Sequence, residues 1–161
     1  MVPTEADIHS LNGVKPELDQ IVIKALADGG QPFIVGQGLR SEADEEKAVA
    51  GGFSHTMNSK HLKQPDGWGW AVDLIPLVGG QVIWRLPQGA QWAPIYRVAA
   101  AMRAAAVSFG FSIRWGGVWD RELNFLGASA DDLEAEVHDY AARMGGHPFL
   151  DGPHFEWVRK Q

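Results

Sequence analysis

Apolar residues recur at helical spacing in three long stretches of the chain. In each stretch they stand three and four residues apart, which is the period of a helix with one buried face. Glycine follows each stretch, as it commonly does where a helix ends. The pattern therefore predicts long helices over residues 16–28, 93–109 and 131–144. A shorter helix is predicted from Ser41, a favoured N-cap residue, to Ala50.

Short apolar runs between these helices predict strands. The runs cover residues 33–35, 71–77, 111–115 and 154–158. The Gly79-Gly80 pair is placed to turn the second run back into a hairpin partner over residues 81–86. Because helices and strands do not alternate regularly, this order favours an α+β fold.

Composition narrows the function classes. The 161 residues suit a single domain, spanning residues 1–161, with one core. The net charge of −6, without a basic run, does not suggest a nucleic-acid partner. No apolar run approaches the roughly 18 residues of a membrane span. The first residues lack the basic and apolar regions of a signal peptide, so we expect synthesis in a cytoplasm and release by another factor.

Three polar residues have the chemistry of a metal site. Cysteine is absent, so a transition metal has to be bound by histidine and carboxylate ligands. Asp73 interrupts the apolar run 71–77, where a buried carboxylate is costly unless a cation offsets its charge. His61 lies in a polar loop before that run, and His154 lies in the last predicted strand. We hypothesise that the three bind one zinc ion and leave an open position, as catalytic zinc sites do.

Further residues are assigned roles around this ion. Asp151 is the predicted general base, beside a zinc-bound water whose pKa the ion lowers towards about 7. Arg40 follows a glycine at a strand exit and is predicted to stabilise a developing oxyanion. Ser59 and Glu156 are placed to support the two histidines through hydrogen bonds.

Aromatic residues are predicted to line a cleft at this site, because tryptophan offers a flat face and one hydrogen-bond donor. The candidates are Trp68, Trp70, Trp115 and Trp119, and His55 is predicted to neighbour the site. Structural roles stay open for several of these residues. Arg40 also suits the surface at a helix start, Asp151 also suits a turn, and at least two of the tryptophans are expected in the core.

Several short motifs together resemble the zinc D-Ala-D-Ala carboxypeptidase and L-alanyl-D-glutamate endopeptidase family, and most of all its phage endolysins. The family's pattern is Ser-x-His, then Gly-x-Ala-x-Asp, then an acidic residue three positions before a late histidine. The matching motifs stand in the family's order: Gly38-Leu39-Arg40-Ser41, Ser59-Lys60-His61, Gly69-Trp70-Ala71-Val72-Asp73-Leu74 and Asp151-Gly152-Pro153-His154-Phe155-Glu156.

The resemblance implies a Hedgehog-like, D,D-peptidase α+β fold, with a small antiparallel sheet and flanking helices. It implies zinc on His61, Asp73 and His154, a general base at Asp151 and transition-state stabilisation by Arg40. The implied substrate is the stem peptide of bacterial peptidoglycan, cut at an L-alanyl-D-glutamate bond by zinc-bound hydroxide. An endolysin of this kind is made in the host cytoplasm and reaches the wall through a separate holin. We also expect a monomer.

The chain departs from the family in one spacing. The family usually has its first histidine and its aspartate seven residues apart, whereas His61 and Asp73 are twelve apart, as if five residues around Gln64 to Trp68 were inserted. We expect this insertion to form a lip over the substrate groove, with Trp68 and Trp70 as contacts. No EF-hand-type spacing of oxygen ligands is present, so no calcium site is predicted.

Two other functions stay open at this point. A D-Ala-D-Ala carboxypeptidase would use the same zinc site but release free D-Ala. A non-catalytic cell-wall-binding module would bind zinc and hydrolyse no murein. The presence of a candidate base beside the candidate ligands favours the endopeptidase over this module.

Overall fold

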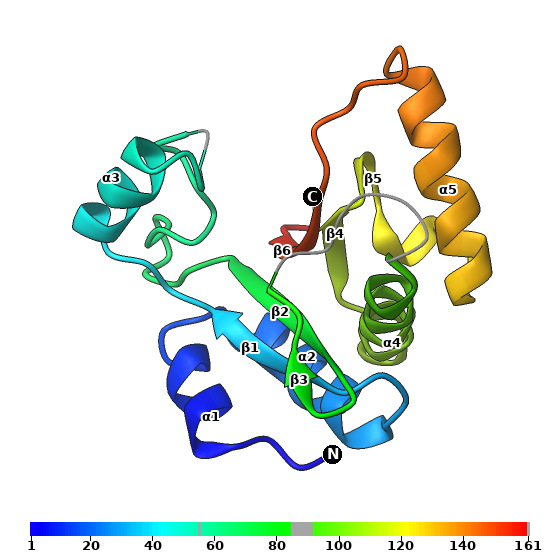
Figure 1. The fold of residues 1–161 in the computed structure, drawn as a ribbon. Coiled ribbons are helices and arrows are strands. Elements are labelled where there is room, and N and C mark those ends of the chain that lie inside the picture. Colours follow the sequence, from blue (N-terminus) through cyan, green and yellow to red (C-terminus); the bar gives the residue numbers. More distant parts are fainter. Residues whose placement is uncertain (55, 85–91, 161) are drawn as a thin grey trace.

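The structure, a computed structural model, describes residues 1–54, 56–84 and 92–160. Over this part of the chain, five α-helices and a short 3-10 helix surround one six-stranded sheet (Figure 1). Every strand pair in the sheet is antiparallel. The predicted α+β class, with a small antiparallel sheet and flanking helices, is therefore confirmed.

The sheet has the strand order β1-β2-β6-β4-β5, and β3 pairs with β2 outside this path. The last strand of the chain, β6, therefore lies in the middle of the sheet, between β2 and β4. The strands are β1 (Phe33–Gln37), β2 (Ala71–Val78), β3 (Gln81–Val82), β4 (Ser112–Gly116), β5 (Val118–Glu122) and β6 (Asp151–Val158). This order brings residues from the middle and the end of the chain next to one another.

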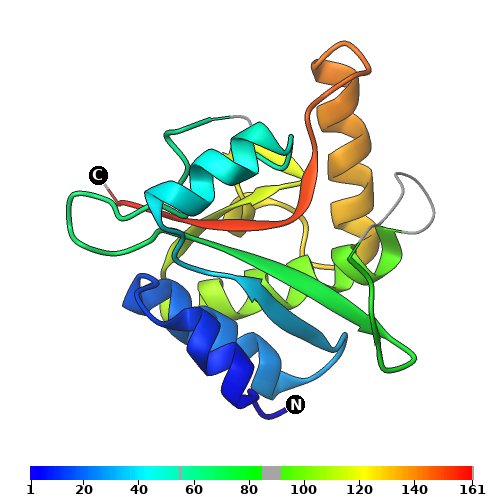
Figure 2. The same ribbon diagram turned by 60° about the vertical axis from the view of Figure 1, so that its left-hand side comes forward.

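Two helices cover one face of the sheet and form the core with it. Helices α2 and α4 pack against each other, and α4 also packs on β2 and β4. Helix α3 lies on the opposite side of β2 and β6 (Figure 2). The helices are α1 (Glu5–Leu11), α2 (Pro16–Asp28), α3 (Glu42–Ala50), α4 (Ala93–Phe109) and α5 (Ala130–Arg143), with a 3-10 turn at Leu123–Phe125. No helix among the described residues is long and apolar enough to cross a membrane.

The four predicted helices are present with their boundaries correct to within a residue. Ser41 is the N-cap of α3, and its Oγ accepts a hydrogen bond of 3.1 Å from the backbone amide of Asp44. The predicted hairpin is present as β2 and β3, although residues 85–86 of the prediction lie outside the described part of the chain. The closing strand β6 begins at Asp151, three residues earlier than predicted.

The apolar pattern missed helix α1 and strand β5. Helix α1 has seven residues, too few to show a helical period, and depends on a capping box between Thr4 and Asp7. The second oxygen of the buried Asp7 carboxylate accepts a 2.8 Å hydrogen bond from the backbone amide of Val35. One acidic side chain thus caps the start of helix α1 and joins the helix to β1. Strand β5 ends in three charged residues, Asp120 to Glu122, and only Val118 in it is buried, so it lacks the alternation that marks a half-buried strand.

Candidate metal centre

Asp73 and His154 are direct cross-strand partners. The register between β2 and β6 pairs their Cα atoms, and directly paired residues project from the same face of a sheet. Their neighbours Val72 and Phe155 are also paired, project from the other face and are fully buried in the core. The apolar contacts of one face therefore determine which polar residues meet on the other.

His61 reaches the same place from the segment that precedes β2. Its ring Nδ1 lies 2.8 Å from the backbone carbonyl oxygen of Gly38, and the Arg40 amide donates a 2.8 Å hydrogen bond to the His61 carbonyl. Because a carbonyl only accepts, Nδ1 carries the proton and Nε2 keeps a lone pair. Gly38 cannot be replaced without movement, since a Cβ there would stand 1.9 Å from the Ser10 carbonyl oxygen.

Ser59 forms a hydrogen bond with His61, and the bond goes to the backbone of the histidine. The Ser59 Oγ accepts a hydrogen bond of 3.2 Å from the backbone amide of His61, not from its ring. The ring is held by the Gly38 carbonyl instead. Ser59 therefore orders the turn that carries the histidine, while the backbone carbonyl sets the direction of the imidazole.

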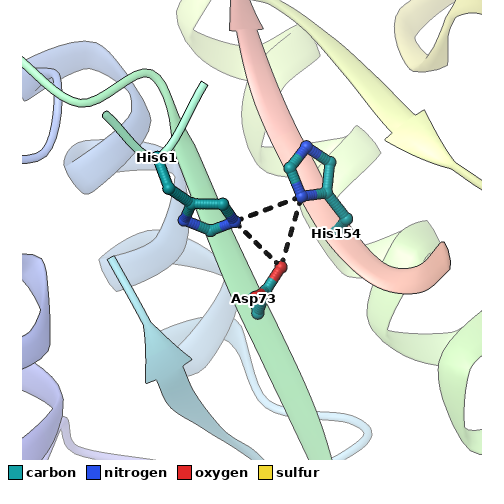
Figure 3. A group of neighbouring side chains, drawn as sticks. All are labelled: His61, Asp73 and His154. Carbon is teal, nitrogen blue, oxygen red and sulfur yellow. Dashed lines mark hydrogen bonds and ion pairs between the residues drawn. The ribbon is translucent and has the colours of Figure 1, made fainter. Parts of the chain in front are cut away.

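The three predicted ligand atoms form a nearly equilateral triangle (Figure 3). The His61 Nε2 lies 3.2 Å from the Asp73 Oδ1 and 3.3 Å from the His154 Nδ1, and the third side measures 3.3 Å. A tetrahedral ion with bonds of about 2.0–2.1 Å separates its ligands by about 3.3 Å. These residues form a group that could hold a metal ion, and the spacing of their donor atoms fits a tetrahedral one.

The charges in this group favour an ionised aspartate. Burial opposes the charge of Asp73, but the imidazoles of His61 and His154 outweigh burial and hold the pKa of this carboxyl well below its usual range. The pKa of His154 is raised, because its hydrogen bond to Asp73 and the nearby carboxylates outweigh the opposing effect of burial. A negative oxygen between two ring nitrogens is a suitable ligand set for a divalent cation.

A pocket of about 290 Å³ opens over the three residues. Its floor is formed by the ligand group, and its walls come from the segment after α3, from β5 and from the approach to β6. Among the described residues, the lining consists of Arg40, Phe53, Ser54, Thr56, Asn58, Ser59, Lys60, His61, Asp73, Trp119, Phe149, Asp151, His154 and Glu156. The predicted ligands, base and electrophile therefore share one cavity.

Asp151 is the first residue of β6 and lines this pocket beside His154. Its backbone is fixed by a close approach to β4, since a Cβ on Gly116 would stand 2.1 Å from the Asp151 carbonyl oxygen. The next carbonyl, of Gly152, accepts a 2.7 Å hydrogen bond from the indole nitrogen of Trp115. Trp115 is fully buried, so it anchors this strand from the core. Contrary to the prediction, it does not line the cleft.

Arg40 lines the pocket and is held there by a buried carboxylate. Its Nη1 lies 2.7 Å from an oxygen of Glu45, whose side chain is 0% exposed. The other Glu45 oxygen accepts a hydrogen bond from the Ser54 hydroxyl. Burial favours the neutral acid, but these hydrogen bonds and the Arg40 charge keep the pKa of Glu45 below its usual value. The guanidinium is therefore oriented by an ionised partner.

Glu156 projects from the same face of β6 as His154, as predicted, and lines the pocket. It is 7% exposed and faces Arg114 across the β4–β6 pair, with a distance of 3.8 Å between the Arg114 Nη1 and the Glu156 Oε1. The negative charge of Glu156 contributes to the raised pKa of His154.

The inserted segment after His61 does not reach the pocket. Residues 64–68 form a turn, in which the Asp66 carboxylate lies 2.7 Å from the Lys15 Nζ and accepts a hydrogen bond from the Trp70 indole nitrogen. Trp70 packs edge-on against Trp157, and Trp68 is 38% exposed on this turn. None of the described lining residues belongs to this segment. Contrary to the prediction, the segment forms no lip over this pocket.

Trp119 is the tryptophan that lines the pocket. Its ring is tilted against His154 at a centroid distance of 5.4 Å and stacked on Phe149 at 6.0 Å. The indole nitrogen donates a 3.1 Å hydrogen bond to the Phe149 carbonyl. His55, the other predicted neighbour of the site, lies outside the described residues.

Known peptidases are similar to this chain in sequence and in structure. A family model described as "Phage L-alanyl-D-glutamate peptidase" matches residues 4–158. The L-alanyl-D-glutamate peptidase of Escherichia phage T5 is 30% identical over 137 residues, which cover 83% of this chain and 86% of that protein. The L-Ala D-Glu endopeptidase ChiX of Serratia marcescens has a similar structure, with a TM-score of 0.68 and 29% identity over 98% of this chain and 90% of that one.

The family model spans nearly the whole chain, including all three residues of the ligand group and the candidate base. The relative and the structural neighbour also cover most of it, at identities that support more than a shared fold. The predicted family is confirmed, and with it the assignment to peptidases. This protein belongs to the phage L-alanyl-D-glutamate peptidase family.

Proposed function

We propose that this protein is a zinc endopeptidase that hydrolyses the bond between L-alanine and D-glutamate in the stem peptide of bacterial peptidoglycan. The observation that carries the proposal is the triangle of His61, Asp73 and His154 at the floor of a pocket that Asp151 and Arg40 also line. The names of the phage T5 relative and of the Serratia neighbour specify the same bond.

The donor set supports zinc as the metal. Two imidazole nitrogens and one carboxylate oxygen are ligands that zinc accepts, and three protein ligands leave a fourth position open. The His61 Nε2 offers a lone pair because the Nδ1 proton is committed to the Gly38 carbonyl. When bound, the ion supplies a Lewis acid that acidifies water and polarises a carbonyl group.

Asp151 and Arg40 are assigned the remaining chemistry. The Asp151 carboxylate takes a proton from the attacking water as the new C–O bond forms, and then gives this proton to the nitrogen of the leaving D-glutamate as the C–N bond breaks. Arg40, oriented by Glu45, stabilises the negative charge that develops on the scissile carbonyl oxygen. The reaction consumes one water and yields one carboxylate and one amine.

Digestion of purified murein tests the proposal. The expected products are glycan that ends in L-alanine and peptides that begin with D-glutamate, identified by mass spectrometry. A chelator should abolish this release and zinc should restore it. Free D-alanine as the product would instead establish a D,D-carboxypeptidase, and tight zinc binding without any hydrolysis would establish a wall-binding module.

Asp151→Asn separates binding from catalysis. We expect this variant to retain zinc and to lose roughly 10²- to 10⁴-fold in kcat, the usual contribution of a general base. Asp131→Asn, on the exposed first turn of α5, is the matched control and should keep full activity. A fully active Asp151→Asn enzyme would show that another group moves the proton.

The biological role proposed with this activity is host lysis by a phage. We propose that the protein is a monomer made in the host cytoplasm and released to the wall through a separate holin. Expression in bacteria should then cause lysis only when the inner membrane is permeabilised. Light scattering on the purified protein, with an expected mass of 17.6 kDa, tests the oligomeric state.

A further inference from the structure

We propose that Phe53 packs against the sugar that carries the stem peptide and thereby makes the enzyme prefer stem peptides that are still attached to glycan. This inference rests on the proposed function and adds a specificity-determining residue to it. Phe53 lines the same pocket as the ligand group and is 80% exposed. An apolar ring that borders a catalytic pocket and faces water is typical of a ligand contact.

The backbone that carries this exposed ring is fixed by hydrogen bonds. The amides of Phe53 and Ser54 both donate to the Ala48 carbonyl of α3, over 2.8 and 3.1 Å. The Ser54 hydroxyl donates a hydrogen bond to Glu45, which is fully buried. Because this backbone is already ordered, little conformational entropy is lost when a ligand covers the ring.

The contacts of Arg40 put Phe53 on the acyl side of the scissile bond. Arg40 is assigned to the scissile carbonyl oxygen, and Glu45 holds both its guanidinium and the Ser54 hydroxyl, one residue from Phe53. Asp151, assigned to the leaving nitrogen, comes instead from the start of β6. In Figure 1, α3 lies to the left of β2 and β6, and β5 with the segment leading to β6 lies to the right. The acyl half of the substrate therefore extends towards Phe53 and the amine half towards β5.

The acyl half of the proposed substrate ends in a sugar. The scissile carbonyl belongs to L-alanine, whose nitrogen is acylated by the lactyl group of a muramic acid in the glycan. The sugar therefore begins one residue from the scissile bond. Its C–H groups and the methyl groups of its acetyl and lactyl substituents offer apolar surface, which gains free energy when an aromatic ring covers it. The amine half begins with a charged glutamate, which an apolar ring does not favour.

Two synthetic peptides that differ only in the group on the alanine nitrogen test the inference. Both contain the L-alanyl-D-glutamyl bond and the same residues after it, and the nitrogen carries an N-acetylmuramoyl group in one peptide and an acetyl group in the second. For the wild type, we expect kcat/KM to be about tenfold higher on the muramoyl peptide, because burial of part of an aromatic face is favourable. In Phe53→Ala this ratio should fall to about one, and Phe53→Tyr should keep most of it because the ring is retained.

Phe125→Ala is the matched control. Phe125 is also 80% exposed, but it belongs to the 3-10 turn Leu123–Phe125 and is not among the described lining residues. Its replacement removes an equally exposed ring without changing the pocket, so this variant should keep the wild-type ratio. Zinc content and thermal unfolding of each variant verify that the ligand group and the fold are intact.

The outcomes separate this inference from the proposed function. If the wild type cleaves both peptides equally well, or if Phe53→Ala keeps the wild-type ratio, the sugar contact is overturned while the endopeptidase stands. If Phe53→Ala loses the same factor on both peptides, Phe53 acts on the peptide or through Arg40, and the sugar contact is excluded. If the zinc-loaded wild type cleaves neither peptide, both proposals fall.

Discussion

Asp73 and His154 face each other across two neighbouring strands although 81 residues separate them in the chain. Their pairing depends on the register between β2 and β6, and a slip by one residue would turn every side chain of one strand to the opposite face. The buried pair of Val72 and Phe155 on the other face opposes such a slip. The geometry of the candidate metal centre is therefore a consequence of core packing, and only His61 arrives from outside the sheet.

The first prediction concerns Asp73→Ala. Loss of the one anionic ligand should abolish stoichiometric zinc binding. In the wild type, zinc at about 100 times its dissociation constant should stabilise the folded protein by roughly 2.7 kcal/mol. In a domain of 161 residues this corresponds to roughly 5–10 °C in Tm. A chelator should thus lower the Tm of the wild type by this amount and leave the Tm of Asp73→Ala unchanged, as measured by calorimetry.

Asp131→Ala is the control for this experiment, because Asp131 is exposed and remote from the pocket lining. It should show the same chelator response as the wild type. One zinc per chain in Asp73→Ala, measured by elemental analysis, would contradict the assignment of the ligands.

Much of this site could be predicted from the sequence, since its chemistry is carried by unusual residues in short motifs. An aspartate within an apolar strand and a late histidine are conspicuous, and the structure brings Asp73, His154 and His61 together. The helices could be predicted because their apolar period is regular. Strand β5 and helix α1 could not, since one is polar and the other depends on a cap.

The partners of the site residues could not be predicted in the same way. Glu45 stands in the first turn of α3, where an acidic residue is expected to interact with the helix dipole, and only the folded chain shows it buried beneath Arg40. Tryptophan is equally suited to a core and to a cleft. Burial of Trp115 and exposure of Trp119 to the pocket follow from strand register, which composition does not specify.

The second prediction concerns the pair of Arg40 and Glu45. Glu45→Ala leaves a cation without its buried partner and should cost roughly 3 kcal/mol of unfolding free energy. Glu45→Gln keeps the shape but loosens the guanidinium, so we expect kcat to fall by about tenfold with little change in KM. Urea unfolding and steady-state kinetics on a defined peptide measure the two effects.

An apolar replacement of both residues separates stability from activity. The double variant Arg40→Met/Glu45→Leu should recover most of the lost stability, because it leaves no buried charge unpaired. Its kcat should nevertheless be about 10²- to 10³-fold below the wild type, as for loss of an oxyanion donor. High activity in this double variant would remove Arg40 from the mechanism.

The third prediction concerns acid stability and the inserted turn. Burial opposes the charge of Asp66, but hydrogen bonds from Lys15 and Trp70 prevail and leave its pKa below the usual aspartate value. A depressed pKa in the folded state stabilises the protein above the unfolded pKa of about 3.9, and this contribution is lost as the pH falls through the folded pKa. Asp66→Asn should therefore be less stable than the wild type at neutral pH.

Urea midpoints measured across the acid range test this prediction. The difference between the wild type and Asp66→Asn should be constant above about pH 5 and should shrink steadily below it. Asp28→Asn, which removes an exposed ion pair with Lys24, should show a much smaller difference. A difference that grows on acidification would have the wrong sign for a depressed pKa.

The last prediction compares a tryptophan of the pocket with a tryptophan of the inserted turn. Trp119 lines the pocket and lies against His154, whereas Trp68 lies on the inserted turn outside the lining. Trp119→Ala removes an aromatic wall of the pocket and should lower kcat/KM on murein by about tenfold. Trp119→Phe should keep most of the activity, because it preserves a stacking surface on Phe149. Trp68→Ala should lyse walls at the wild-type rate, since its ring contacts solvent rather than the cavity. A wall-lysis assay on all three variants, each checked for zinc content, distinguishes the pocket wall at Trp119 from the inserted turn at Trp68. A slow Trp68→Ala enzyme would show that the substrate extends over the inserted turn.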